Sequence, residues 1–209
     1  MWLHERNVAA QALANIRTEV AHDIGVEQAV RRRTPCILQR LAEVGHILDD
    51  PDARLDPVRS PIWIGPSPVG DMPRTRYEAA SSAGRLALLD PDDERTIANF
   101  YTDFVEFDEA ERQQSAAFAQ LRSLTTMRSA IPDADRARLR GALQEARRAA
   151  FVISVDAQVF GEAARRWAIR PDDVAMGRLG NLAYSSCIPL RTPPAEAAAR
   201  IASPFGLPE

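Results

Sequence analysis

The stretch "SSAGRLALLDPDDERTIANFY" (residues 81–101) decides the fold, because it fits either a phosphate-binding loop or a corner between two helices. A phosphate-binding loop needs glycines whose backbone N–H groups face an anion at the start of a helix. Here Gly84 precedes Asp90 by six residues, and the acids at 92–94 would repel an anion from the helix start. Asp90 suits an N-cap and Pro91 suits the first helical position. The stretch therefore predicts a corner, with Gly84 ending the first helix in the left-handed conformation.

Two long helices are predicted after this corner. Apolar residues recur at three- and four-residue steps from Asp92 to about Arg128 and from Pro132 to about Ile169. Two helices of about 54 Å that are joined by a few residues form an antiparallel hairpin. The second of them carries an additional apolar line, which predicts that more than one neighbour covers it: Phe151, Val152, Val155 and Val159.

A still longer helix is predicted at the N-terminus, from Leu3 to Leu48, where the apolar stripe keeps helical spacing. Pro35 interrupts this stripe, and two interpretations fit. Either Pro35 kinks one continuous helix, or Thr34 caps a new helix that has Pro35 at its first position. The kink is favoured because the stripe continues in phase on both sides of the proline.

The segment 51–74 is predicted to be a proline-rich loop, since its six prolines exclude a helix and the interior of a sheet. Trp63 lies in its middle between two isoleucines, so we expect its ring to be buried against the helices. After the loop, Thr75 and Glu78 have the spacing of a capping box at the start of a short helix.

These elements together predict an all-α fold. We expect an elongated antiparallel helical bundle over residues 1–170 and a C-terminal extension, 171–209, that packs on it. Aromatic residues make up only 6% of the chain and alanine is abundant, which favours close-packed helices over a β-sandwich.

The composition excludes several classes of function. All 26 basic residues are arginine, which excludes both a Schiff-base lysine and the lysine of a P-loop. A net charge of −3 gives no attraction to nucleic acid. The sequence contains neither an apolar run long enough to cross a membrane nor the apolar core of a signal peptide.

The N-terminal helix, the short helix and the corner carry a pattern that resembles a family of uncharacterised bacterial membrane-anchored proteins. The matching residues lie within about the first 130 positions: Trp2, Glu5, Arg6, Tyr77, Glu78, Ser82, Gly84, Leu86, Leu88, Asp90, Phe100 and Tyr101. Members of that family look like a transmembrane helix followed by an elongated helical domain, and this sequence departs from them in lacking the transmembrane helix. The resemblance implies the periplasmic face of the inner membrane, with attachment only through a helix absent from this chain. Without the resemblance, a cytoplasmic location is expected.

Three charged residues of the N-terminal helix form the first candidate site. Asp23 and Glu27 fall within the apolar stripe, and Arg31 follows Glu27 by four residues. They fit a polar layer that fixes the register of the helices, or a polar patch that senses a ligand.

Asp156 and Phe104 form the second candidate site. Asp156 lies in the most apolar part of its helix, where a buried carboxylate would have a raised pKa and would serve as an acid or base. A partly exposed or arginine-paired Asp156 is the alternative. Phe104 belongs to an aromatic cluster that fits either a pocket lining or packed core.

Cys36 and Cys187 are the only cysteines of the chain. They fit a disulfide that ties the C-terminal extension to the first helix, which the periplasmic location implied by the resemblance would preserve. The alternative is two buried free thiols. Two cysteines and three scattered histidines do not make a zinc site, so we expect no metal.

No spacing in the sequence supports a catalytic set or a cofactor site. The sequence therefore favours a non-enzymatic extracytoplasmic interaction or sensory domain, with a protein partner or a second copy of the chain as its partner. A small-ligand-binding helical module is the alternative, and an enzyme of unrecognised type that uses Asp156 is a third hypothesis.

Overall fold

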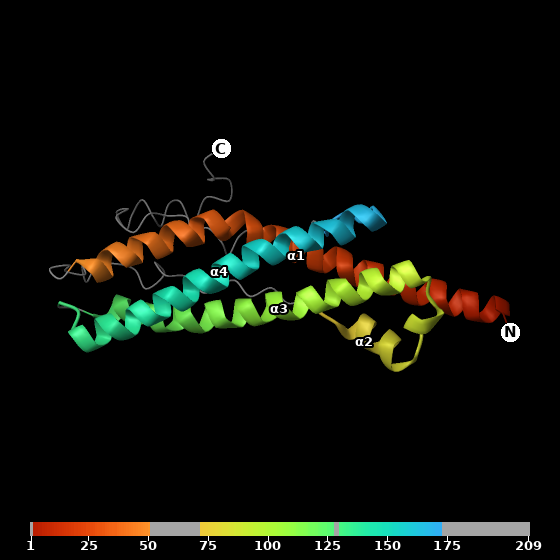
Figure 1. Cartoon of the computed structure of the whole chain (residues 1–209), viewed down its shortest axis with the longest axis horizontal. Helices are drawn as coiled ribbons and strands as arrows, with labels where there is room; N and C mark the ends of the chain where they lie inside the picture. The colour runs from red at the N-terminus through yellow and green to blue at the C-terminus, as the bar shows by residue number, and fades with distance from the viewer. Residues whose placement is uncertain (1, 51–71, 128–129, 173–209) are drawn as a thin grey trace.

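The computed structural model describes residues 2–50, 72–127 and 130–172, and within these ranges the fold is all-α. Figure 1 shows an elongated bundle in which three long helices run side by side and a short one lies near one end. The helices, with two short 3-10 turns, are α1 (Trp2–Asp49), α2 (Thr75–Ser82), η1 (Leu86–Leu88), α3 (Pro91–Leu121), η2 (Arg122–Thr126) and α4 (Asp133–Trp167).

The helix α1 continues through Pro35, which confirms the interpretation of one helix with an internal proline. The alternative, a new helix capped by Thr34, is wrong, because the Thr34 hydroxyl donates to the Val30 carbonyl oxygen, 3.3 Å away, within the same helix. Pro35 faces the solvent. The ribbon of α1 changes direction near its middle, as expected where a proline removes a hydrogen bond of the helix (Figure 1).

The predicted hairpin is present, since α3 and α4 are antiparallel and α4 packs against both α3 and α1 (Figure 1). The rings of Phe100 and Phe160 lie 5.1 Å apart between centroids across this hairpin. Trp167 Nε1 donates to Asp93 Oδ1 at 2.8 Å at its open end. These contacts fix the register of the two helices at the open end of the hairpin.

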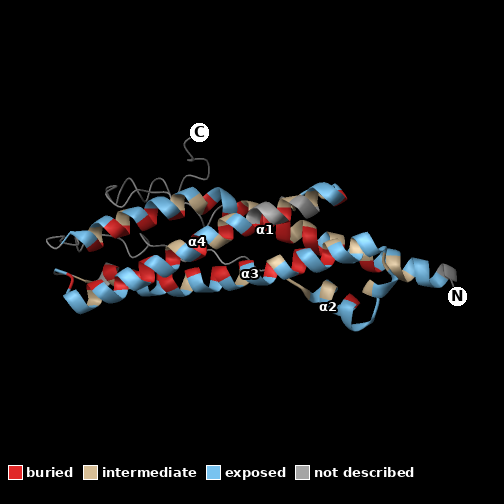
Figure 2. Ribbon diagram, in the orientation of Figure 1, coloured by how far each residue is buried: buried red, intermediate tan, exposed pale blue. Residues whose placement is uncertain are grey.

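The buried residues form two core clusters. Figure 2 shows buried segments in red that recur along each of the three long helices. The first cluster joins residues 12–30 of α1 to residues 97–110 of α3 and to the C-terminal half of α4, and it contains every described aromatic contact. The second joins residues 37–48 of α1 to residues 117–124 and 139–150, and it is mostly aliphatic.

The corner before α3 has the predicted chemistry. Asp90 caps α3 by accepting a hydrogen bond from the Asp92 backbone N–H at 2.9 Å, and Pro91 is the first helical residue. Gly84 has a φ of 65°, in the left-handed region that favours glycine. The predicted capping box at Thr75 is wrong, because Arg74 is the N-cap and the Thr75 hydroxyl donates to Glu19 of α1 instead.

Two predictions lie outside the described residues: the burial of Trp63, with most of the loop 51–74, and the packing of the extension 171–209. The described chain ends at Asp172, whose backbone N–H donates to the Ala21 carbonyl oxygen of α1 at 3.0 Å. Among the described helices, none combines the length and the apolar run that a membrane crossing requires.

Neighbouring residues on α3 provide a test of this packing. Phe104 is 1% exposed and Val105 is 48% exposed. We expect Phe104→Ala to lower the free energy of unfolding by about 3–5 kcal/mol, because it opens a cavity in the first core cluster. The matched change Val105→Ala should stay within about 0.5 kcal/mol. Urea unfolding of both variants measures this, and equal losses would show that α3 does not present this face to the core.

Candidate functional site

Three carboxylates of α1 form a buried row on one face of the helix. Glu19, Asp23 and Glu27 follow each other at four-residue steps and are 3%, 0% and 2% exposed. Residues four apart in a helix are neighbours on its surface, so the three acids lie one above the other against the bundle. We call this set the acidic row. Like charges so placed destabilise each other unless hydrogen bonds or protons compensate.

Hydrogen bonds from two other helices stabilise the buried carboxylate of Glu19. Tyr101 Oη of α3 donates to Glu19 Oε1 at 2.6 Å, and the backbone N–H groups of Arg76 and Tyr77 donate at 2.8 and 3.1 Å. The Thr75 hydroxyl completes the set at 3.5 Å. Burial raises the pKa of Tyr101 well above its ordinary value, and the hydrogen bond to Glu19 raises it further. Tyr101 therefore stays a proton donor at any physiological pH.

Glu27 has a different environment. Its Oε1 atom is buried and has no hydrogen-bond partner. Burial raises the pKa of Glu27 from 4.5 to about 7, and the positive charge of Arg31 acts in the opposite direction. Arg31 itself is exposed, so the structure brings Asp23 and Glu27 together in the interior and leaves the third predicted member at the surface.

Asp156 is buried on the side of α4 that faces α3, and its Oδ2 atom has no hydrogen-bond partner. Burial raises the pKa of Asp156 to about 6, and the negative charges of Glu106 and Asp103 raise it as well. The carboxyl group thus titrates closer to neutrality than an exposed aspartate. Its neighbours are acids rather than the arginine that the alternative interpretation expected.

Phe104 is packed in the first core cluster. Its ring lies 6.0 Å from the Tyr101 ring, between centroids, and Arg74 Cζ lies 5.6 Å from the Phe104 centroid. The aromatic cluster is therefore part of the packed core, and the guanidinium of Arg74 lies over the Phe104 ring.

A second buried polar set, which the sequence analysis did not single out, lies where the two core clusters meet. Its members are Arg33, Arg40, Glu111 and Gln114, all at most 5% exposed. Burial lowers the pKa of Arg33 and of Arg40 to about 10, and Glu111 and Glu43 respectively counteract this. Arg40 Nε lies 3.3 Å from Glu43 Oε2. We call this set the central polar layer.

The heptad spacing of α1 is the signal that would have revealed most of these groups. Glu19, Arg33 and Arg40 fall on one line of seven-residue steps that also contains the buried Val26. Residues seven apart return to the same helix face, so a single buried member implicates the others.

Only one of the two cysteines of the predicted disulfide lies within the described residues. Cys36 is disulfide-bonded. Cys187, the only other cysteine of the chain, lies outside the described residues, so its pairing with Cys36 stays a prediction.

One described cleft lies at the start of α1. It has a volume of about 350 Å³ and is lined by the apolar side of α1 and by η1 and the corner: Glu5, Arg6, Ala9, Ala10, Leu13, Leu88, Leu89 and Asp90. None of the predicted site residues lines it. Among the described residues no group of three or more His, Cys, Asp or Glu side chains could hold a metal ion.

No family model matches the chain, and the comparisons with curated proteins and with solved structures find no match either. The interpretation of the site therefore depends on its own chemistry.

Glu27 gives a pH-dependent stability whose sign follows from its burial. The folded state binds the Glu27 proton more tightly than the unfolded state, so this contribution is fully present below pH 4.5 and is lost as the pH rises to about 7. The loss is on the order of 3 kcal/mol. We expect Glu27→Gln to remove this component, so that the variant exceeds the parent in stability at pH 8 but not at pH 4.5.

Urea unfolding at a series of pH values measures the difference between parent and variant. Asp156 also makes stability depend on pH, but its contribution is the same in parent and variant and cancels in this difference. Glu145→Gln is the matched control, because Glu145 is exposed on α4. Parallel pH curves for Glu27→Gln and the parent would contradict the assignment.

Proposed function

We propose that this chain is a non-enzymatic, extracytoplasmic interaction and sensory domain, whose contact surface lies where α4 and α1 run side by side. The observation that carries this proposal is the exposure of Phe151, 68%, in the middle of a helix. Val155, one turn further along α4, is 43% exposed. Contiguous apolar surface on a soluble domain is typical of protein interaction sites.

Leu38 of α1 extends this surface. The side chain of Arg147 reaches the Leu41 carbonyl oxygen at 3.4 Å, and the two helices are antiparallel. Leu38 lies about one turn before Leu41 in α1, and Phe151 lies about one turn after Arg147 in α4. Because the helices are antiparallel, Leu38 and Phe151 lie at the same height along the bundle. Leu38 also shares a face with Gly45, which lies against Arg147, and it is 47% exposed. We call Leu38, Phe151 and Val155 the apolar patch.

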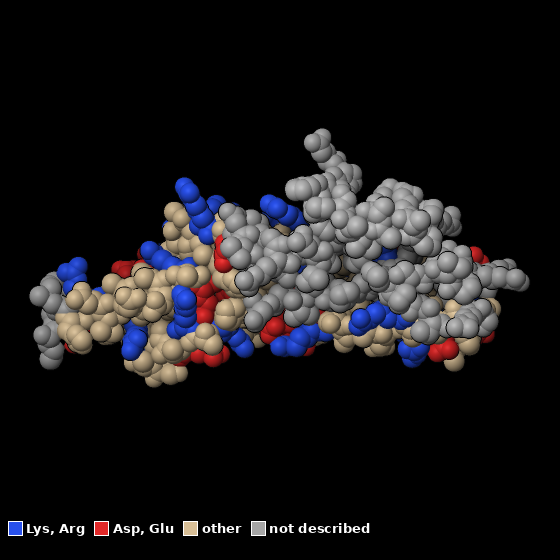
Figure 3. Space-filling model, turned by 180° about the vertical axis from the view of Figure 1, so that it is seen from behind, with Lys and Arg blue, Asp and Glu red and all other residues tan. Residues whose placement is uncertain are grey.

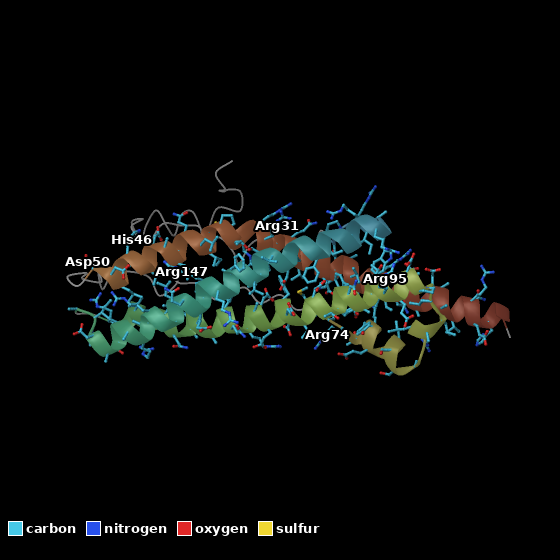
Figure 4. All side chains as sticks on the ribbon, in the orientation of Figure 1. Arg31, His46, Asp50, Arg74, Arg95 and Arg147 are labelled. Carbon is cyan, nitrogen blue, oxygen red and sulfur yellow. The ribbon has the colours of Figure 1, made fainter. Side chains whose placement is uncertain are left out.

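Two arginines lie near the apolar patch. Arg31 and Arg147 both project from the part of the bundle where α1 and α4 are adjacent (Figure 4). On the opposite face of the molecule, arginines and acids alternate over the described surface (Figure 3). The apolar patch therefore differs from the mixed polar surface that keeps a domain monomeric.

The enzyme hypothesis has less support, because the buried acids of the candidate site face packed core rather than a substrate cleft. Glu19 is fully engaged in hydrogen bonds to α2 and α3. The small-ligand hypothesis through Phe104 has less support for the same reason.

A location outside the cytoplasm is part of the proposal. The disulfide-bonded state of Cys36 favours an oxidising compartment. The resemblance to membrane-anchored proteins adds a periplasmic setting, with attachment through a helix outside this chain.

Self-association through the apolar patch is the direct test of the contact surface. We expect the purified chain to associate in a concentration-dependent manner, because two copies of the patch bury each other around a two-fold axis. Phe151→Ser should weaken this association at least about tenfold. Val105→Ser, at another exposed apolar position, on α3, is the control and should change nothing. Sedimentation equilibrium measures both, and a parent chain that stays monomeric would contradict self-association.

The compartment has its own test. We expect protein isolated from the oxidising compartment, without reductant, to take up no alkylating reagent, because Cys36 and Cys187 are joined. Intact mass spectrometry measures this, and the same sample after reduction is the control and should gain two alkyl groups. Two alkylated thiols before reduction would contradict both the bond and the proposed location.

A further inference from the structure

One buried carboxylate holds α2 on the bundle. The donors that reach Glu19 include three from the first residues of α2, namely the Thr75 hydroxyl and the backbone N–H groups of Arg76 and Tyr77. A carboxylate at the start of a helix satisfies N–H groups that have no partner within the helix and stabilises its positive end. Glu19 therefore caps α2 from another helix, 56 or more residues away in sequence.

The apolar contribution to this docking is small. Six of the eight residues of α2 are exposed, and only Ala80 is buried. Tyr77 stacks on Tyr101 with 4.0 Å between ring centroids, and this is the main ring contact of the helix. A helix of eight residues is not stable in water by itself. The docked state of α2 therefore depends on Glu19, Tyr101 and Tyr77.

The rest of the bundle does not depend on α2 in the same way. Within the described residues of the hairpin only Tyr101 of α3 donates to Glu19, and neither the helix–helix packing of α3 on α4 nor the second core cluster includes Glu19. The chain leaves α2 at Gly84, which has a φ of 65° and open space where a side chain would lie. This position allows the backbone to turn without disturbing α3. The N-cap of α3 is formed within its own first residues, by the Asp90 side chain and the Asp92 N–H, and involves no residue of α2.

We propose that α2 is a releasable clasp, held shut by the Glu19 carboxylate, and that its release uncovers Tyr101 and the aromatic core around Phe104 without unfolding the bundle. Units of this kind open with a lower free energy than the whole domain. Release exposes a carboxylate, a phenol and an aromatic ring in one place, which α2 covers in the docked state. The clasp is independent of the apolar patch, which lies on α1 and α4.

Amide hydrogen exchange tests the clasp. In Glu19→Ala, we expect the amides of Arg76 and Tyr77 to exchange at least about tenfold faster, because both lose their acceptor. The amides of residues 146–150 in α4 should keep their parental rates, since they report opening of the whole bundle. Tyr101→Phe keeps the stacked ring and removes one donor to Glu19, so it should give a smaller increase at the same two amides.

Two results would overturn the proposal. Unchanged exchange at Arg76 and Tyr77 in Glu19→Ala would show that the carboxylate does not hold α2. Equal acceleration in α2 and in residues 146–150 would show that Glu19 supports the whole fold rather than a separate clasp. If Glu19→Ala does not fold, Glu19→Gln decides between these results, because it keeps one acceptor oxygen and replaces the other by an NH2 group that cannot accept.

Limited digestion with trypsin gives a second readout of the same opening. All basic residues are arginine, so α2 offers the protease a single internal site, at Arg76. We expect faster cleavage after Arg76 in Glu19→Ala than in the parent, while Glu145→Ala, at an exposed acid of α4, cleaves at the parental rate.

Discussion

The packing of α4 against α1 is the contact on which the rest of the structure depends. A helix of 48 residues is about 72 Å long and is not stable in water unless one face is packed. α4 lies against both α1 and α3, so a single helix joins the two halves of the chain. Gly45 faces α4 at this contact, and a Cβ there would lie 2.8 Å from the end of the Arg147 side chain and 3.5 Å from Leu143 Cδ2.

Arginines of α4 also donate hydrogen bonds to the last carbonyl groups of α1. Arg136 Nη1 donates to the carbonyl oxygens of Leu48 and Asp50 at 2.6 and 2.9 Å, and Arg140 Nη2 donates to Leu48 at 3.0 Å. The last carbonyl groups of a helix have no partner within it, and positive charge is favourable there. The helices of the hairpin are about 47–53 Å long and are therefore shorter than α1. α2 and η1 pack on the N-terminal part of α1 and extend its cover.

Most of the fold was predictable because local signals and packing agree. Apolar periodicity identified the long helices, and Asp90, Pro91 and Gly84 marked the corner between two of them. The capping box at Thr75 failed because the helix starts one residue earlier, with Arg74 as N-cap, and because a distant carboxylate, Glu19, accepts from the Thr75 hydroxyl and from the Arg76 and Tyr77 N–H groups. No local pattern contains that contact.

The candidate site was less predictable for a related reason. Asp23 and Glu27 could be identified because they interrupt an apolar stripe, but the exposure of Arg31 depends on which face of α1 the other helices cover. The central polar layer needs partners from α1 and α3, more than 70 residues apart, so the heptad line of α1 marks Arg33 and Arg40 but cannot show which residues of α3 meet them.

The buried acids with raised pKa values lie in one half of the bundle, so the two halves differ in how they respond to pH. Glu27 and Asp156, whose pKa values are raised by burial, both belong to the half that contains the aromatic core and α2. The other half, beyond Pro35 and the central polar layer, is a mostly aliphatic cluster closed by arginine contacts to the end of α1. Ionisation of a buried acid weakens the packing around it, whereas aliphatic packing has no protons to exchange. A rise in pH therefore acts on the half of the bundle that carries the clasp and leaves the aliphatic half as a fixed frame.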